Sequence, residues 1–206
     1  AGGCDPILPD GACPAGTMEE LGATGCVAVG VTACATGFEP DGGGGCDPVL
    51  PVGSCAEGTL EVIGHAECQP LGACGEGPWG EIPLDEDTVF VDQAYPGSDA
   101  DGTAERPFAR IADALPWVPM DGQVAVAAGV YAEPLELEQA VRITGRCAAL
   151  VTLQGVRVGA SNRPSLIVRA VSVRVRVGGV TLRSAAEGLV VDGAEEVALD
   201  GVQVLD

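Results

Sequence analysis

The chain has 206 residues, a formal net charge of −20, and 30 acidic residues against 10 basic ones, all of them arginine. This balance excludes a nucleic-acid partner, because binding to phosphates requires a basic surface that displaces counterions, and it disfavours anionic membrane surfaces for the same reason. No apolar run approaches the ~20 residues of a transmembrane helix, so no transmembrane segment is predicted. Residues 1–105 contain 19 acids and no arginine, whereas residues 106–206 contain all the arginines and 11 acids. This asymmetry predicts two regions with different roles.

The first region contains a tandem cysteine repeat. Residues 3–22, GCDPILPDGACPAGTMEELG, recur as residues 45–64, GCDPVLPVGSCAEGTLEVIG. Eight of the nine cysteines form two sets of four that align at offsets of 42, 42, 42 and 40: Cys4, Cys13, Cys26, Cys34, and then Cys46, Cys55, Cys68, Cys74. The sequence therefore predicts two repeats, residues 1–45 and 46–75.

Disulfides are the predicted reason for these cysteines. The residues between them are mostly small or polar, so the repeats bury too little apolar area to offset the entropy of an ordered backbone. Disulfides compensate for that deficit and place the protein in an oxidising compartment. Structural zinc sites favour closely spaced C-x2-C pairs, which are missing here. Four cysteines per repeat allow three pairings, and the spacing does not select one.

A Gly, Pro and acid-rich stretch, residues 76–87, is predicted to be a linker. Residues 88–91 then form a β-rich run, and residues 107–115 have helical spacing, with Phe108, Ile111, Ala112 and Leu115 on one face. A turn at Asp121-Gly122 precedes a further strand. We expect Trp117 and Tyr131 to pack in this cap region rather than to serve as platforms for sugar rings.

Asp99 and Asp101 stand two residues apart before Gly102, as at the start of a calcium loop. The glutamate that would close an EF-hand is missing, and capping of a turn by these side chains is the favoured interpretation. Calcium is therefore the only cofactor that the sequence suggests, at Asp99 and Asp101.

Three windows of alternating aliphatic residues follow: residues 151–158, 175–182 and 197–204. Their alignment predicts four columns of stacked side chains: Val151 with Val175 and Val197; Leu153 with Val177 and Leu199; Val156 with Val180 and Val202; and Val158 with Leu182 and Val204. Strict alternation also predicts that Val171, Val173, Val175 and Val177 share one face of a strand, opposite Arg174 and Arg176. The central glycines, Gly155, Gly179 and Gly201, recur every 22–24 residues and are predicted to lie at the corners.

This period with short strands is typical of a β-solenoid. A leucine-rich repeat has a similar period, but its leucine-asparagine consensus is absent. The predicted fold class is all-β: a right-handed parallel β-helix over residues 88–206 with a short N-terminal capping helix, preceded by the disulfide-rich repeats. Because the last window is apolar, further coils are expected beyond Asp206. The ninth cysteine, Cys147, is expected either to pair with a cysteine outside the sequence or to be a buried thiol.

Residues 89–115, VFVDQAYPGSDADGTAERPFARIADAL, and 122–145, GQVAVAAGVYAEPLELEQAVRITG, resemble the N-terminal cap and first coil of the pectate-lyase-like superfamily of right-handed parallel β-helices. The full layout, with cysteine repeats ahead of the β-helix, is similar to exported surface proteins of myxobacteria. This resemblance implies an architecture rather than an activity, because the fold hosts lyases, hydrolases, epimerases, adhesins and structural proteins.

The candidate ligand face consists of Arg157, Arg174 and Arg176, which could recognise an anionic sugar; the alternative is that they only keep the strands soluble. No catalytic residue is predicted. The outward acids of the coils, Asp192, Glu195, Glu196 and Asp200, do not recur in register, as paired catalytic carboxylates would, and the only histidine, His65, aligns with Ala23 in the first repeat.

We expect an exported, cell-surface or secreted structural or adhesive protein whose partner is an extracellular polysaccharide or another surface protein. The alternative is a polysaccharide lyase or glycoside hydrolase on the same scaffold.

Overall fold

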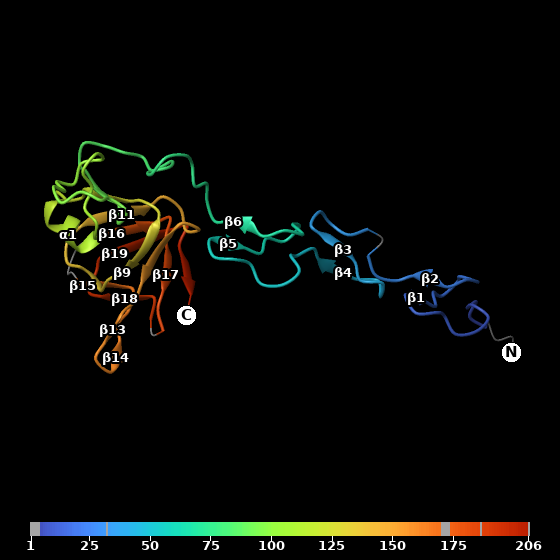
Figure 1. Ribbon diagram of the computed structural model, residues 1–206. Coiled ribbons are helices and arrows are strands. Elements are labelled where there is room, and N and C mark those ends of the chain that lie inside the picture. Colours follow the sequence, from blue (N-terminus) through green and yellow to red (C-terminus); the bar gives the residue numbers. More distant parts are fainter. Residues whose placement is uncertain (1–4, 32, 170–173, 186, 206) are drawn as a thin grey trace. The chain divides into compact units, whose positions relative to one another are not determined.

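The computed structural model describes residues 5–31, 33–169, 174–185 and 187–205, so that Cys4, Val171 and Val173 lie outside the described residues (Figure 1). The chain divides into two compact units. The repeat unit comprises Ala1–Cys55 and Glu61–Gln69, and the solenoid unit comprises Ala56–Leu60 and Pro70–Asp206.

The cysteine repeats form short antiparallel hairpins. Strands β1 (Thr17–Met18) and β2 (Val27–Ala28) pair, as do β3 (Phe38–Pro40) and β4 (Cys46–Pro48). Strands β5 (Thr59–Leu60) and β6 (Gln69–Pro70) form the hairpin that corresponds to β1 and β2, 42 positions later. The same local sequence therefore folds in the same way twice.

The disulfides that join these hairpins do not all stay within the predicted repeats. Cys13–Cys26 and Cys55–Cys68 are equivalent bonds in the two repeats, but Cys34–Cys46 joins the end of the first repeat to the start of the second. Cys147 bonds to Cys74, so both expectations for it, a partner outside the sequence and a buried thiol, were wrong. Spacing along the chain could not reveal this pair because 73 residues separate its members.

The solenoid unit is a parallel β-helix built from three sheets, which confirms the predicted fold class (Figure 1). The five-stranded sheet has the order β19-β16-β11-β8-β7, the four-stranded sheet β20-β17-β12-β9, and the three-stranded sheet β10-β15-β18. Their bounds are β7 (Thr88–Val91), β8 (Gln123–Val126), β9 (Gly129–Ala132), β10 (Leu135–Leu137), β11 (Val141–Gly145), β12 (Val151–Gln154), β15 (Leu166–Arg169), β16 (Arg174–Gly178), β17 (Thr181–Arg183), β18 (Leu189–Asp192), β19 (Glu196–Asp200) and β20 (Gln203–Leu205). The chain visits the sheets in turn. Three coils, beginning at β8, β11 and β16, each add one strand to every sheet, whereas β7 adds one strand to the five-stranded sheet alone and β19 and β20 extend two sheets.

The core consists of aliphatic columns that run from coil to coil. Val124, Ile143, Val177 and Leu199 are register partners on successive strands of the five-stranded sheet. A second column continues from Tyr131 through Leu153 and Leu182 to Val204 in the four-stranded sheet. On β16, Val175 and Val177 are buried whereas Arg174 and Arg176 are exposed, as the alternation predicted.

The first of the three predicted windows does not stack on the other two. Val151 lies on β12, which pairs with β9 and β17, and the register partner of Val175 is Val141 on β11. The predicted stacking of Val175 on Val197 and of Val177 on Leu199 is correct. Leu153 therefore stacks on Leu182 and not on Val177. Alternation shows which residues point inward, but it is the same on all three sheets and does not identify the sheet.

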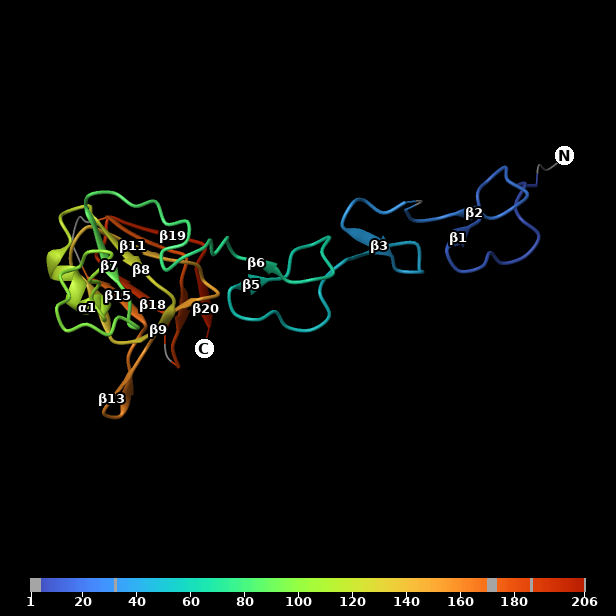
Figure 2. The same cartoon turned by 45° about the horizontal axis from the view of Figure 1, so that its top comes forward.

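A hairpin insertion explains the misaligned period. Strands β13 (Arg157–Val158) and β14 (Ser161–Asn162) pair with each other outside the three sheets and project from the solenoid (Figures 1 and 2). This coil is 34 residues long when measured from Val141 to Val175, whereas the next, from Val175 to Val197, has 22. Val156 and Val158 accordingly do not continue the columns of the other two windows.

Gly145 ends β11, and Gly179 and Gly201 directly follow β16 and β19. Gly155 directly follows β12, so it lies where the chain leaves a different sheet. Gly179 and Gly201 adopt positive φ angles of 62° and 58°, which favour glycine. A Cβ on Gly145 would collide with the carbonyl oxygen of Gly179 on the next coil. Positions 145, 179 and 201 therefore need glycine because the backbone turns sharply there and the coils approach closely.

The capping helix is shorter than predicted. Helix α1 covers Ile111–Ala114 and continues as the 3-10 helix η1, Leu115–Trp117. Phe108 instead exchanges backbone hydrogen bonds with Phe90 and Asp92 of the neighbouring strand region, which keeps the start of the predicted helix extended. Ile111, the first residue of α1, has a fully buried side chain.

Other parts of the cap region also pack on the solenoid. Trp79 and Ile82 come from the predicted linker, yet the ring of Trp79 lies 4.8 Å from that of Phe90 and Ile82 is only 8% exposed. Tyr131 is buried and donates a hydrogen bond of 2.9 Å to the carbonyl oxygen of Ala127, and its burial raises the pKa of the phenol. Trp117 stacks on Phe108 but is 68% exposed, so its packing is one-sided.

Glu133 caps α1 from 22 residues away. Its carboxylate is buried and accepts hydrogen bonds from the backbone N–H groups of Ile111 (2.9 Å) and Ala112 (3.0 Å). Arg110, the residue preceding α1, pairs with the same carboxylate at 3.5 Å. Glu133 therefore satisfies two N–H groups that a helix start otherwise leaves unpaired.

Replacing Glu133 by alanine is expected to lower the free energy of unfolding by about 1–3 kcal/mol, because the buried N–H of Ile111 and the partly buried N–H of Ala112 lose their acceptor. Hydrogen exchange of the Ile111 and Ala112 amides should accelerate in the same variant. Glu138→Ala, which removes an exposed carboxylate close by in sequence, is the matched control and should leave both amides protected. Unchanged exchange in Glu133→Ala would contradict the capping role.

Candidate functional site

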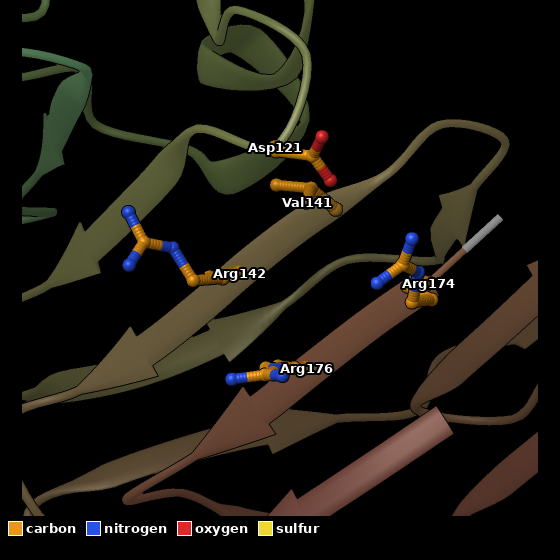
Figure 3. Close-up of a pocket in the computed structure, with 5 residues that line it drawn as sticks. All are labelled: Asp121, Val141, Arg142, Arg174 and Arg176. Carbon is orange, nitrogen blue, oxygen red and sulfur yellow. The ribbon is translucent and has the colours of Figure 1, made fainter. Parts of the chain in front are cut away.

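The candidate site lies on the outer face of the five-stranded sheet. Alternation directs Arg174 and Arg176 outward from β16, and the register places Arg142 of β11 beside Arg176. Figure 3 shows these arginines on two neighbouring strands, with Asp121 at the adjacent turn. Arg142, Arg174 and Arg176 are called the arginine strip below.

The arginine strip lines an open groove. Its central part, of about 280 Å³, is formed by the strip with Asp121 and Val141. A second depression of about 410 Å³ shares Arg142 and Arg176 and extends to Glu196 and Asp200. A third, of about 510 Å³, shares Asp121 and Arg174 and extends to Met120. Neighbouring depressions share lining residues, so the three adjoin one another along the sheet, and together they are called the groove below.

Asp121 is held in an unusual backbone conformation at this groove. Its φ angle is 60°, the only positive φ of a non-glycine residue in the described part of the chain. Aspartate tolerates this left-handed region better than most residues. The turn is held by hydrogen bonds from the Asp121 N–H to the carbonyl oxygen of Ala140 and from the Gly122 N–H to that of Pro119.

The members of the arginine strip differ in their partners. Arg142 pairs with Asp85 at 2.7 Å, and hydrogen bonds from Thr88 and then Arg142 hold the pKa of the Asp85 carboxyl below its usual value. This pair is therefore ionised at neutral pH and is lost only as the pH falls through the lowered pKa. The Nε of Arg142 is buried and has no hydrogen-bond partner.

In the described chain, the guanidinium groups of Arg163, Arg174 and Arg176 have no ion pair or hydrogen bond. Arg163 follows the inserted hairpin and does not line these depressions, so Arg174 and Arg176 are the unpaired arginines of this face. Glu196 is the register partner of Arg174 on β19, yet no ion pair joins the two. Other arginines of the solenoid unit are paired, for example Arg169 with Glu136 and Arg183 with Glu57. Two neighbouring unpaired guanidinium groups, next to a third, have the chemistry to bind an anion through charged hydrogen bonds.

The structure does not bring Arg157 to this face. Arg157 belongs to the inserted hairpin β13–β14, where its Nε donates to the carbonyl oxygen of Gly159 at 3.3 Å. Sequence reasoning instead missed Arg142, which stands between the inward-facing Val141 and Ile143. The alternation of VRITG was the available signal, but only the register showed that β11 is the neighbour of β16.

Asp99 and Asp101 have separate partners within their loop. Tyr95 donates a 2.8 Å hydrogen bond to Asp99, which raises the pKa of the tyrosine. Asp101 accepts hydrogen bonds from the Oγ1 (2.7 Å) and the N–H (3.1 Å) of Thr103 and pairs with Arg106; Thr103 is the main cause of its lowered carboxyl pKa. This is the geometry of a capped turn, and no group of three or more potential metal ligands gathers anywhere in the described ranges.

The acids that the sequence places outward on the coils lie at several positions on the solenoid. Glu196 and Asp200 both belong to β19, where four residues of strand separate their Cα atoms by about 13 Å. Asp192 lies on β18 in another sheet, and Glu195 lines the third depression next to Arg174. His65 lies in the repeat unit and is exposed.

Three findings bear on the whole chain. Four disulfides indicate an oxidising compartment. The helices of the described residues are all too short to cross a lipid bilayer. Comparisons with protein-family models, curated proteins and solved structures found no match.

Proposed function

We propose that this chain is an exported structural or adhesive protein of the cell surface or the extracellular space, and that its arginine strip binds an acidic polysaccharide. The observation that carries the proposal is the pair of unpaired guanidinium groups of Arg174 and Arg176, placed beside Arg142 in an open groove. The oxidising compartment indicated by the disulfides fits an exported protein.

The chemistry of the groove supports an anionic chain as the ligand. Guanidinium groups bind carboxylates and sulfates through paired hydrogen bonds. Residues along one strand face repeat about every 6.6 Å, and neighbouring strands lie about 4.8 Å apart, so a sheet presents cations at regular intervals. An extended polymer with a regularly spaced charge can contact several of them at once.

The cap sequence supports the same setting. Its likeness to the pectate-lyase-like superfamily, and the likeness of the whole layout to exported myxobacterial surface proteins, agree with a polysaccharide-rich environment. A polysaccharide lyase or glycoside hydrolase is the competing function.

The expected result is that the protein binds a uronate polymer such as polygalacturonate, with an affinity that falls as salt increases, because screening weakens contacts between exposed charges. The double variant Arg174→Ala/Arg176→Ala should bind at least about 10-fold more weakly, since each lost charged hydrogen bond removes ~1.5 kcal/mol or more. Isothermal titration calorimetry with the uronate polymer and a neutral glucan measures both effects.

Arg157→Ala is the matched control, because it removes an exposed arginine outside the groove and should leave the affinity unchanged. Equal loss in this variant would show that binding follows net charge alone. Unsaturated uronate products or new reducing ends in the same mixtures would favour the enzyme over the adhesive protein. Binding that survives in Arg174→Ala/Arg176→Ala would reject the arginine strip as the site.

A further inference from the structure

Part of the second cysteine repeat belongs to the solenoid unit. Residues 56–60 and 70–75, called the junction segments here, contact the solenoid through one disulfide, one ion pair and four hydrogen bonds. The disulfide is Cys74–Cys147, and the guanidinium of Arg146 donates to the carbonyl oxygens of Cys74 (2.8 Å) and Gly75 (2.7 Å). Glu57 pairs with Arg183.

The remaining contacts come from Gln203. Its side-chain oxygen accepts from the Gly58 N–H at 2.6 Å, and its side-chain nitrogen donates to the carbonyl oxygen of Thr59 at 3.3 Å. Arg146 and Cys147 follow β11, Arg183 ends β17, and Gln203 begins β20. The junction segments therefore hold residues of three successive coils.

Cys147 has the same bonding role in the solenoid that Cys46, the first cysteine of the second repeat, has in that repeat. Cys34, near the end of the first repeat, bonds to Cys46 at the start of the second. Cys74 aligns with Cys34 and bonds to Cys147. Each repeat is thus tied by its last cysteine to the module that follows it, and the solenoid is the module that follows the second repeat.

The four disulfide loops also follow one another along the chain without overlap. A pull along the chain therefore passes from loop to loop through the sulfur atoms. It enters the solenoid at Cys147 and bypasses the 73-residue loop that contains β7 to β11.

The strands next to Cys147 are interior strands. β11 is paired with β8 on one side and β16 on the other, and β12 is paired with β9 and β17. β7, where the chain would otherwise enter, is the end strand of its sheet. A load on an end strand separates one ladder of hydrogen bonds, whereas a load beside β11 and β12 acts on strands held by a ladder on each side.

We infer that this protein is a load-bearing tether, in which the Cys74–Cys147 bond and the junction segments carry tension from the cysteine repeats into the middle of the solenoid. This function goes beyond ligand binding and does not depend on it. The disulfide supplies the covalent path. Glu57, Gly58 and Thr59 lie within the Cys55–Cys68 loop, so their contacts with Arg183 and Gln203 add a parallel, non-covalent path from Cys55 to later coils.

Single-molecule pulling between the two ends of the chain tests the inference. The oxidised protein is expected to unfold at a higher force than the Cys74→Ala/Cys147→Ala variant. The variant should release an additional ~25 nm, the length of 73 extended residues, in early steps at low force as the first coil separates. The Cys13→Ala/Cys26→Ala variant is the matched control; it should release only ~4.5 nm more and keep the unfolding force of the solenoid.

Equal unfolding forces in the oxidised protein and in Cys74→Ala/Cys147→Ala would overturn the inference. A second pair of variants, Arg183→Ala and Gln203→Ala, keeps the disulfide and tests the distribution of load directly. A lower unfolding force in these variants supports load sharing among the coils, and an unchanged force rejects it. Loss of polysaccharide binding in Arg174→Ala/Arg176→Ala, with an unchanged unfolding force, would separate the two functions.

Discussion

Replacing Cys74 and Cys147 together by alanine is expected to lower the free energy of unfolding of the solenoid by about 4 kcal/mol. The bond closes a loop of 73 residues, and cross-links of this span remove roughly that much chain entropy from the unfolded state. Denaturant titration followed by tryptophan fluorescence measures the change, because Trp79 packs against Phe90 of the first coil and should respond when that coil unfolds.

The control for this prediction removes the equivalent of an ordinary repeat disulfide. Cys13→Ala/Cys26→Ala opens a loop with a sequence separation of 13 in the repeat unit and should leave the solenoid transition in place. A shift of the solenoid transition in this control as large as in Cys74→Ala/Cys147→Ala would mean that the solenoid depends on disulfides in general. The special role of Cys147 would then be lost.

Truncating the central aliphatic column should have a comparable effect. Ile143→Ala is expected to destabilise the solenoid by about 3 kcal/mol, because Ile143 is fully buried between Val124 and Val177 and its truncation leaves a cavity that the coils on either side cannot fill. Thermal or denaturant unfolding gives the difference directly.

Leu199 provides a matched comparison within the same column. It follows Val177 on the last coil described and is 45% exposed, so Leu199→Ala should cost only about 1 kcal/mol. Similar losses in both variants would argue against a core that is strongest in the interior coils. Such a result would also weaken the argument that load entering beside β11 meets more resistance than load entering at β7.

The sequence predicted the fold class more accurately than it predicted which strands stack on one another. Alternation is a property of each strand, so the inward positions of Val175, Val177, Val197 and Leu182 followed from the residues alone. The stacking of the 151–158 window on the other two did not hold, because an inserted hairpin changes the period without changing the alternation. A period can be measured only where no insertion interrupts it, as between β16 and β19.

The candidate site could be predicted in part for the same reason. Arg174 and Arg176 were identified because they alternate with buried valines on one strand. Arg157 alternates in the same way, but its strand belongs to the hairpin. Arg142, 32 residues before Arg174 in the chain, became a neighbour only through the pairing of β11 with β16. No local pattern contains that information.

Composition and short-range pattern were sufficient for the properties that each segment carries on its own: the disulfide-stapled hairpins, the alternating strands and the acidic N-terminal region. Composition and short-range pattern were not sufficient to predict the long-range pairings. These include the Cys74–Cys147 bond, the capping of α1 by Glu133, the neighbours of each strand and the gathering of the arginine strip. Side-chain periodicity and short disulfide loops act over a few to about a dozen residues. Which distant segments meet depends on the length of every coil between them. That length is defined only in the folded structure, where the coils stack and the strand register shows how many residues each coil contains.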